Sequence, residues 1–326
     1  MRKLNILFIA QWYPANIQKF LAEGFRAIGC DVKLVGQVVK DHYNIVWPEK
    51  DIPELFFEVP KLDPIDLSAI VDKSTALGFT PDILILNDWW DMPIAKTETR
   101  IPFILISHEG WEKDFKRIHE FKPTLAFTGQ PFGVHAEPRT SIYPGYQWLP
   151  GACLPSVHPL LNYDREYDFV LLASMYDPRP RICNALQEKG LRIKYGNVPI
   201  NEYAILHNKS LTTYSCSNGQ EYIKWRVFEA MSMGCLLLSD KFFLMEQLFT
   251  DGVHYLSVKT DKLEDGRTAL NVDDLYDKIM LCRRNKELVE RITRNAFIEV
   301  RSKHTYMHRA QMMLEKLGFL KQEFKF

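Results

Sequence analysis

The sequence lacks paired cysteines, long apolar runs and an excess of charge of either sign. Its six cysteines are scattered without a C-x-x-C pair, which favours reduced, mostly buried thiols in a cytoplasmic protein. The apolar runs are far too short to cross a bilayer, so no transmembrane segment is predicted. Lysine and arginine total 41, as do aspartate and glutamate, so any nucleic-acid contact has to be a local patch.

Several motifs of enzyme active sites are also missing. The chain has no G-x-G-x-x-G fingerprint, Walker loop, D-x-D, H-E-x-x-H or G-x-S-x-G. Without G-x-G-x-x-G, the chain has no sequence fingerprint of a dinucleotide-binding site. Without D-x-D, group transfer that depends on a metal held by that motif is disfavoured. We therefore predict no metal site, no cofactor and no enzymic nucleophile.

Short apolar runs alternate with helical patterns along most of the chain. "LNILFIA", "PDILILND" and "IPFILISHE" indicate buried strands in the first half, and "YDFVLLAS" and "CLLLSD" indicate strands in the second. The stretch that follows Asn271, a predicted N-cap, has the pattern of one long helix. Alternation of this kind predicts α/β domains with parallel sheets.

A proline-rich stretch between Pro144 and Asp168 interrupts this alternation. Its four prolines and two glycines show no sustained period, which is typical of a linker. The chain length of 326 residues also fits two domains. We predict a first domain over residues 1–150, a linker over 151–165, a second domain over 166–305, and a C-terminal helix over 306–326 that packs back toward the first domain.

The segment "QEYIKWRVFEAMSMGCLLLSD" places acids and bases just before a predicted helix and strand. Lys224 and Arg226 stand at the N-terminal edge of that helix, where phosphates bind well. Glu221 and Glu229 can each accept hydrogen bonds from a diol. This set would suit a nucleotide sugar, with one acid on the ribose, the other on the transferred sugar, and the bases on the diphosphate. The alternative is that Glu229 only caps its own helix.

Further candidates follow predicted strands, where parallel α/β sheets bind ligands. Arg179 and Arg181 begin a helix after the first strand of the second half, where they either hold a pyrophosphate or are solvated. His108 follows a strand of the first half and either acts in a cleft or is structural. Aromatic residues that can stack on a sugar or a base, or instead cap the core, are Trp12, Trp89 and Trp90.

The segment "RVFEAMSMGCLLLSDKFFLMEQLFTDGVHYLSV" resembles the C-terminal domain of group-1 (family-4-type) glycosyltransferases, closest to the spore-maturation, CgeB-like group. "HTYMHRAQMML" and "LPGACLPSVHPL" are similar to a signature and an inter-domain linker of the same group. The first half is similar only in its strand-helix order and in "ISHEG". The resemblance implies a GT-B fold, with two Rossmann-like domains whose parallel sheets face a central cleft, and a donor bound mainly by the second.

The resemblance also implies roles for single residues. Glu221 and Glu229 match the E-x7-E motif of retaining members, in which the first acid faces the donor sugar and the second the ribose. Arg181, and after it Arg179, match phosphate-binding bases, with Lys224 and Arg226 as secondary candidates. His108 matches a histidine that faces the reaction centre.

We therefore expect a metal-independent, retaining glycosyltransferase that uses a nucleotide-diphosphate sugar, with a UDP-sugar as the first choice. The acceptor stays open between a glycan, a glycoconjugate, a protein, a small metabolite and a hydroxylated base in DNA. The alternatives are a non-catalytic binder of sugar nucleotides or glycans and a sugar-nucleotide epimerase.

Residues 281–309 hold eight Lys or Arg and three Glu. This basic region is either a solvated helix face or a contact with an anionic acceptor or a membrane surface.

Overall fold

The computed structural model describes residues 3–12, 17–39, 41–42, 45–46, 52–59, 65–88, 94–96, 98–107, 121–129, 145–217, 222–263 and 268–320. The chain divides into two compact units. Unit 1 contains most of the chain up to Pro150 together with the segment from Tyr306 onward. Unit 2 is essentially Gly151–Thr305.

Unit 1 is built on a parallel sheet. Its strands among the described residues are β1 (Asn5–Trp12), β2 (Asp31–Val38), β5 (Phe57–Glu58), β7 (Ile83–Asp88), β9 (Phe103–Ser107), β10 (Leu125–Thr128) and β11 (Tyr146–Trp148). They lie in the order β11-β10-β9-β7-β1-β2-β5, and each neighbouring pair is parallel. The strand order reverses between β1 and β7, as in doubly wound folds.

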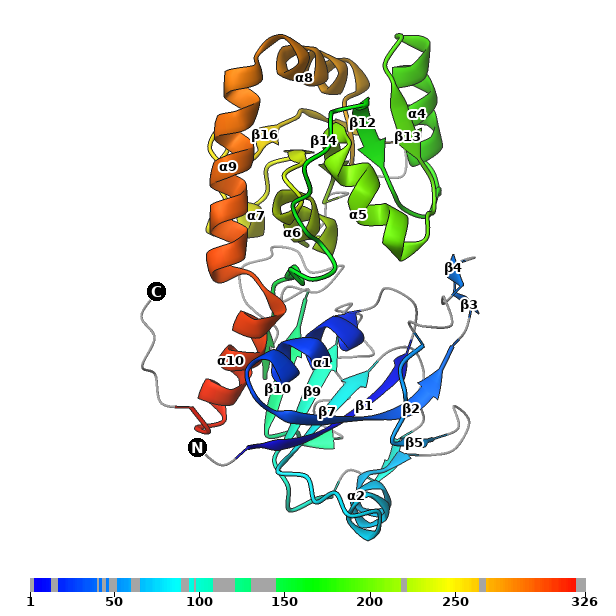
Figure 1. Cartoon of the computed structure of the whole chain (residues 1–326), viewed down its shortest axis with the longest axis vertical. Coiled ribbons are helices and arrows are strands. Elements are labelled where there is room, and N and C mark those ends of the chain that lie inside the picture. The colour runs from blue at the N-terminus through cyan, green and yellow to red at the C-terminus, as the bar shows by residue number, and fades with distance from the viewer. Residues whose placement is uncertain are drawn as a thin grey trace. The chain divides into compact units, whose positions relative to one another are not determined.

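Three helices of unit 1 are α1 (Ile17–Ala27), α2 (Leu67–Ala76) and α10 (Tyr306–Lys316). The helix α10, near the C-terminus, packs against α1 (Figure 1). The rings of Phe20 and Tyr306 lie 5.7 Å apart, and a Cβ at Gly24 would lie 2.4 Å from the Tyr306 carbonyl oxygen. This close approach requires glycine at position 24, because any side chain would collide with the backbone of α10.

Unit 2 has its own parallel sheet. Its strands are β12 (Tyr167–Leu171), β13 (Ile193–Tyr195), β14 (Ser210–Ser215), β15 (Leu236–Ser239) and β16 (Leu256–Ser257). They lie in the order β13-β12-β14-β15-β16 with parallel pairing throughout. The order reverses between β12 and β14, so the crevice at their carboxyl ends is where this topology binds ligands.

Helices cover both faces of the unit 2 sheet. They are α4 (Arg179–Glu188), α5 (Ile200–Asn208), α6 (Trp225–Ser232), α7 (Phe243–Leu248), α8 (Val272–Arg284) and α9 (Lys286–Lys303). Phe169 and Leu171 pack with residues of α4, α8 and α9, whereas Val170 and Leu172 pack with residues of α5 and α6. This alternation buries β12 on both sides, which is why its sequence is a continuous apolar run.

Helix ends follow their local sequence. The Asn271 side chain accepts a hydrogen bond of 2.8 Å from the Asp274 amide, which confirms the predicted N-cap of α8. The predicted single long helix is wrong, because Asn285 separates α8 from α9 and caps α9 by accepting from the Leu288 amide at 3.0 Å. The two helices run in different directions in Figure 1. Gly234 follows α6 with a φ of 68°, a left-handed conformation that ends the helix as predicted.

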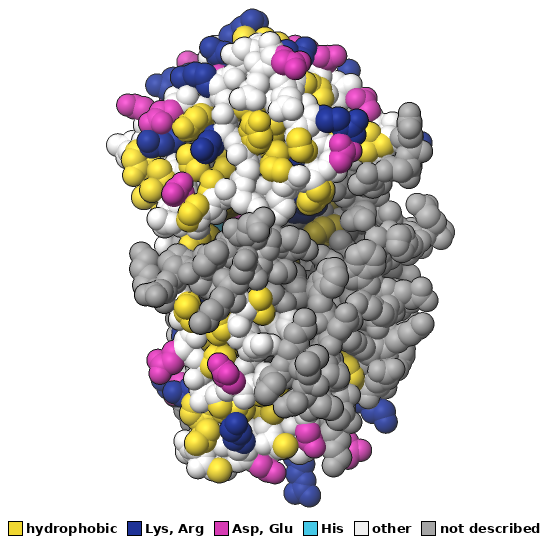
Figure 2. Space-filling view, turned by 90° about the vertical axis from the view of Figure 1, so that its right-hand side faces the viewer, with side chains coloured by type: hydrophobic (Ala, Val, Ile, Leu, Met, Phe, Trp, Pro, Cys, Tyr) yellow, Lys and Arg dark blue, Asp and Glu magenta, His cyan; other side chains and the backbone are white. Residues whose placement is uncertain are grey.

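All six cysteines are buried and none forms a disulfide, as the sequence predicted. In the described part of the chain, no helix has the length and apolarity that a bilayer crossing requires. On the face shown in Figure 2, the Lys and Arg side chains of the described residues are interspersed with Asp and Glu. This mixture agrees with the balanced charge of the sequence.

The basic region 281–309 uses several of its charges internally. Arg301 donates to the His158 carbonyl at 2.9 Å, and Arg309, which is 6% exposed, donates to the Pro150 carbonyl at 2.9 Å. Lys303 pairs with Glu299 at 2.9 Å. These contacts favour a structural role for part of the excess charge over a continuous anion-binding face.

Candidate donor site at the carboxyl edge of unit 2

Two helices of unit 2 begin at the carboxyl edge of its sheet. The helix α4 follows β12, and α6 follows β14, so both start at the point where the strand order reverses. Their N-caps are Pro178 and Lys224, neither of which has a side-chain oxygen to cap the first turn. At the start of α4 the Arg179 N–H donates to the Tyr176 carbonyl at 3.0 Å and Pro180 has no N–H, so α6 has the better-placed N-terminus for an anion at this edge.

Arg179 and Arg226 are anchored to the same loop after β12. Arg179 is 8% exposed, donates through Nη1 to the Ser174 carbonyl at 2.7 Å, and lies over the Tyr176 ring at 4.0 Å. Arg226 donates through Nη2 to the Leu172 carbonyl at 3.1 Å. Burial, and then the positive charge of Arg226, lower the pKa of Arg179. The two guanidinium groups are therefore close enough to repel each other.

Lys224 adds a third positive charge to this edge. Burial, followed by the charges of Arg179 and Arg226, lowers the pKa of Lys224 to about 8, and Cys216 and Asp240 partly oppose that fall. Within the described residues, no acid forms an ion pair with Lys224, Arg179 or Arg226. An anionic ligand would relieve this repulsion, and the arrangement is typical of a phosphate site.

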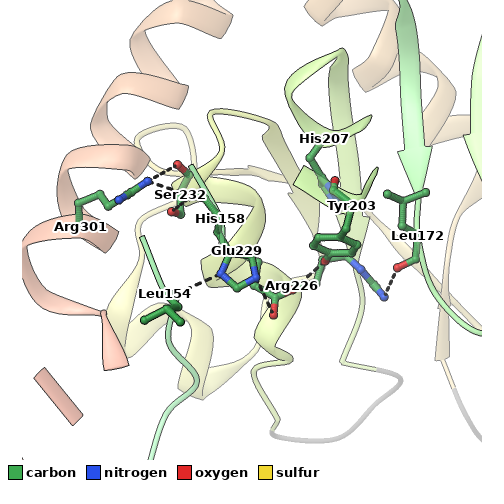
Figure 3. Close-up of polar contacts among 9 residues, drawn as sticks. All are labelled: Leu154, His158, Leu172, Tyr203, His207, Arg226, Glu229, Ser232 and Arg301. Atoms are coloured by element: carbon green, nitrogen blue, oxygen red, sulfur yellow. Dashed lines mark hydrogen bonds and ion pairs between the residues drawn. The ribbon is translucent and has the colours of Figure 1, made fainter. Parts of the chain in front are cut away.

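Glu229 lies one helical turn after Arg226 and is held by two other side chains (Figure 3). Its Oε2 accepts a hydrogen bond of 2.7 Å from the Tyr203 hydroxyl, and its Oε1 lies 3.7 Å from Nε2 of His158. The Glu229 side chain is 14% exposed. Burial raises the pKa of Glu229, whereas the Tyr203 hydroxyl and the charge of Arg226 oppose that rise. The carboxylate is thus partly buried, accepts one hydrogen bond from Tyr203 and has the His158 ring beside its other oxygen.

Two histidines, His158 beside this carboxylate and His207 beside Tyr203, are buried and neutral. Burial, with the charge of Arg301 as a second cause, lowers the pKa of His158 to about 3. Nδ1 of His158 accepts from the Leu154 amide at 3.1 Å, so its hydrogen is on Nε2, which faces Glu229. Burial also lowers the pKa of His207 to about 3, and its Nδ1 contacts the Tyr203 carbonyl at 2.9 Å. A carbonyl only accepts, so Nδ1 of His207 carries the hydrogen.

The structure separates the two arginines that the sequence offered as phosphate ligands. Arg179 joins Lys224 and Arg226, whereas the Arg181 side chain is 69% exposed and pairs with Asp177 at 2.5 Å. The structure thus places Arg179, rather than the sequence's first choice Arg181, beside the other two bases. Glu229 contacts Tyr203 and His158, which gives it partners outside its own helix.

The remaining predicted residues belong to other parts of the chain. Trp12 is fully buried, packs on Phe8 at 5.5 Å and donates from Nε1 to the Val35 carbonyl at 3.0 Å. The prediction that Trp12 stacks on a ligand is therefore wrong, because its ring is enclosed in the core of unit 1. The candidates that lie outside the described residues are His108, Glu221, Trp89 and Trp90.

Sequence reasoning missed Tyr203 and His158. Tyr203 is 26 positions before Glu229, on a different helix, and no motif in the sequence connects them. His158 lies within the predicted linker, where the "SVHPL" string marked only a boundary. Both residues reach Glu229 through the tertiary fold, so the only available signal was their polarity.

The comparisons with known proteins fit this architecture. A family model described as glycosyl transferase-like matches residues 161–315, which span most of unit 2 and nearly all of α10. A search of curated proteins gave no match. The matched part of the chain is a glycosyl transferase-like domain.

Solved structures of similar fold cover nearly the whole chain, each at 12% sequence identity. Sucrose-phosphate synthase from Thermosynechococcus elongatus has a TM-score of 0.62 over 97% of this chain and 98% of that one. Anabaena HepE in complex with UDP and glucose has a TM-score of 0.62 over 97% and 100%. A DNA-modifying β-glucosyltransferase has a TM-score of 0.51 over 96% and 99%. The predicted GT-B fold is confirmed, and the family model agrees with the predicted glycosyltransferase class over the residues that it matches.

Proposed function

We propose that this chain transfers a sugar from a UDP-sugar to a hydroxyl acceptor, without a metal ion and with retention of configuration. The observation that carries the proposal is the meeting of Arg179, Lys224 and Arg226 beside Glu229 at the carboxyl edge of the unit 2 sheet. Three positive charges match a diphosphate, and a supported carboxylate matches a ribose diol. The Anabaena HepE structure, which holds UDP and glucose, supports uridine as the base.

The basic side chains would act on the leaving group. Negative charge grows on the diphosphate as the bond between the sugar and its phosphate oxygen breaks. Fixed positive charge at that position stabilises the transition state without a metal. Lys224 is the N-cap of α6, so the positive end of that helix dipole contributes at the same place.

Retention rests on the spacing of the two acids in the sequence. Glu221 and Glu229 have the E-x7-E separation of retaining members of the family that the sequence resembles. In such enzymes the acceptor attacks from the side on which the diphosphate leaves. We propose that Glu221 holds the transferred sugar and Glu229 the ribose, and that His108 faces the reaction centre.

Calorimetry with a panel of nucleotide sugars, followed by an assay for released nucleotide, tests the proposal. Binding of a UDP-sugar and release of UDP on addition of an acceptor is the expected result. Binding without turnover would instead identify a non-catalytic sugar-nucleotide binder. Conversion of the donor to an isomer without nucleotide release would identify an epimerase.

A hydroxylated base in DNA is the second candidate acceptor, because a DNA-modifying β-glucosyltransferase has this fold. On the one face that Figure 2 shows, the charges of the described residues are mixed and form no continuous basic patch for DNA phosphates. Duplexes with and without hydroxymethylated cytosine, incubated with the donor, separate it from glycan acceptors. Transfer to the modified duplex alone would establish DNA as the acceptor.

A further inference from the structure

The Glu229 carboxylate is contacted on both of its oxygens from outside its own helix (Figure 3). The Tyr203 hydroxyl, on α5, donates to Oε2 at 2.7 Å. Nε2 of His158, in the segment before β12, faces Oε1 at 3.7 Å. Two elements that are distant in sequence therefore converge on one acid.

Each of these two side chains is itself fixed in place. The Tyr203 ring lies 4.3 Å from the His207 ring, and its carbonyl accepts from His207. The His158 imidazole is oriented by the Leu154 amide, while its carbonyl accepts from Ser232 at 2.8 Å and from Arg301 at 2.9 Å. Tyr203, which donates to Glu229, and His158, which faces it, are thus each fixed by contacts of their own.

Both supporting groups are neutral. Burial holds the pKa of His158 near 3, and burial followed by the charge of Glu229 raises the pKa of Tyr203 well above its usual value. They add no charge of their own beside the carboxylate, so the positive charge that acts on Glu229 is that of Arg226. A carboxylate has about four lone-pair positions, so one position on each oxygen stays open. Two adjacent open positions match the two hydroxyls of a cis-diol.

We infer that Tyr203, assisted by His158, is a positioning residue that holds Glu229 for the 2′- and 3′-hydroxyls of a nucleotide ribose. The consequence is a preference for ribonucleotides over 2′-deoxyribonucleotides. A site built to hydrogen-bond a hydroxyl discriminates against an analogue that lacks it, because the polar group of the site is then left unpaired. This inference rests on the proposed function, which places a nucleotide sugar at this edge of unit 2.

The test compares the affinities of UDP and 2′-deoxy-UDP by calorimetry, with the ADP and GDP pairs measured in parallel. We expect the wild type to prefer the ribonucleotide roughly ten- to a hundredfold. Tyr203→Phe removes the hydroxyl and keeps the ring against His207. It should reduce that preference by at least about threefold through weaker ribonucleotide binding, with the deoxyribonucleotide affinity unchanged.

Matched variants separate positioning from general destabilisation. Tyr276→Phe alters a half-buried tyrosine on α8 in the same unit and should keep the full preference. His158→Leu should lower the preference, and His158→Gln should restore part of it because glutamine still has an N–H donor. A purely structural effect would weaken both members of a nucleotide pair equally and leave their ratio unchanged.

The outcomes distinguish the inference from the function on which it rests. A wild type that binds none of the six nucleotides overturns the proposed function and the inference together. Nucleotide binding without a ribose preference leaves the function standing and overturns the inference. A wild-type preference that persists in Tyr203→Phe and in His158→Leu also overturns it, because Glu229 would then need neither support.

Discussion

Arg179 and Arg226 follow different strands of the unit 2 sheet, yet their positive charges lie close enough for Arg226 to lower the pKa of Arg179, after burial itself. Each guanidinium is held by a backbone carbonyl of the loop after β12, Arg179 by Ser174 and Arg226 by Leu172. Folding therefore forces together two charges that repel. Such an arrangement is tolerated at sites that bind an anion, where the ligand supplies the missing negative charge.

The first prediction uses Arg181 as the control for Arg179. Arg179→Gln should weaken UDP binding roughly ten- to a hundredfold, because a charged contact to phosphate is lost. Arg181→Gln should leave the affinity within about twofold, since Arg181 is exposed and paired with Asp177. Calorimetry on the two variants measures the difference. Equal losses in both would show that the phosphates lie farther out along α4 than we propose.

The second prediction concerns the pH dependence of nucleotide affinity. Lys224 has a pKa of about 8 without a ligand, and only its protonated form attracts a phosphate. UDP affinity should therefore fall as the pH rises through 8, by at most about tenfold per pH unit for one group. The phosphate itself, with a second pKa of about 6, no longer titrates in that range.

Binding should also take up protons above pH 8, because the bound anion raises the pKa of Lys224. Calorimetry at pH 8.5 in two buffers of different ionisation enthalpy detects this uptake. Lys224→Gln should bind UDP more weakly at pH 7 and with a flatter profile from pH 7 to 9.5. A wild-type affinity that does not change over this range would mean that Lys224 does not contact the ligand.

Much of the fold follows from local sequence. The apolar runs predicted the parallel strands, and the N-cap at Asn271 and the helix stop at Gly234 were identified correctly. The break between α8 and α9 was missed, although Asn285 is itself a good N-cap residue. An unbroken apolar periodicity on either side of Asn285 hid the change in helix direction.

The site was harder to derive, because its composition depends on burial. Arg179 and Arg181 both lie in the first turn of α4. Only the packing of that helix shows that Arg179 is buried and Arg181 is exposed to solvent. Tyr203 reaches Glu229 across two helices that the sequence does not relate. Trp12 was expected after a strand, as a ligand-binding aromatic would be, but it is the last residue of β1 and is enclosed in the core. Strand ends therefore predict where a site is more reliably than which side chains enter it.

The third prediction separates the roles of the two acids. Glu229→Ala should weaken binding of both UDP and the intact donor roughly ten- to a hundredfold, since the ribose is present in both. Glu229→Gln should act more mildly, because its amide oxygen still accepts from Tyr203. Glu221→Ala should leave UDP binding nearly unchanged and lower kcat/KM for transfer, since UDP lacks the sugar.

Calorimetry with UDP alone decides the assignment of Glu229. Glu287→Ala, at an exposed position on α9, is the matched control. It should change neither the UDP affinity nor kcat/KM for transfer. Glu229→Ala also leaves the Tyr203 hydroxyl without its acceptor, so thermal unfolding has to be followed in the same samples. Wild-type UDP affinity in a folded Glu229→Ala protein would assign Glu229 a structural role only.

The fourth prediction concerns metal ions. The sequence lacks D-x-D, and basic side chains occupy the position expected for the diphosphate. Cleavage of the UDP-sugar should therefore proceed at an unchanged rate in excess EDTA. A metal-dependent glycosyltransferase assayed in the same buffer confirms that the chelator is effective. Loss of activity in EDTA, with recovery on addition of manganese or magnesium, would contradict a metal-independent mechanism.

The fifth prediction follows from the neutral histidines. His158 and His207 have a pKa of about 3 in the folded chain, compared with about 6.5 when unfolded. Below pH 6.5 the unfolded chain therefore binds protons that the folded chain does not. The free energy of unfolding should fall as the pH drops from 6.5 toward 3, by at most about 1.4 kcal/mol per pH unit for each histidine.

The variant His158→Gln removes one of these two contributions, so its free energy of unfolding should fall less steeply with pH than that of the wild type. Urea unfolding followed by circular dichroism between pH 7 and 4.5 measures both slopes. Parallel slopes would show that His158 takes up its proton equally in both states, and the burial of its ring beside Glu229 would then not describe the protein in solution.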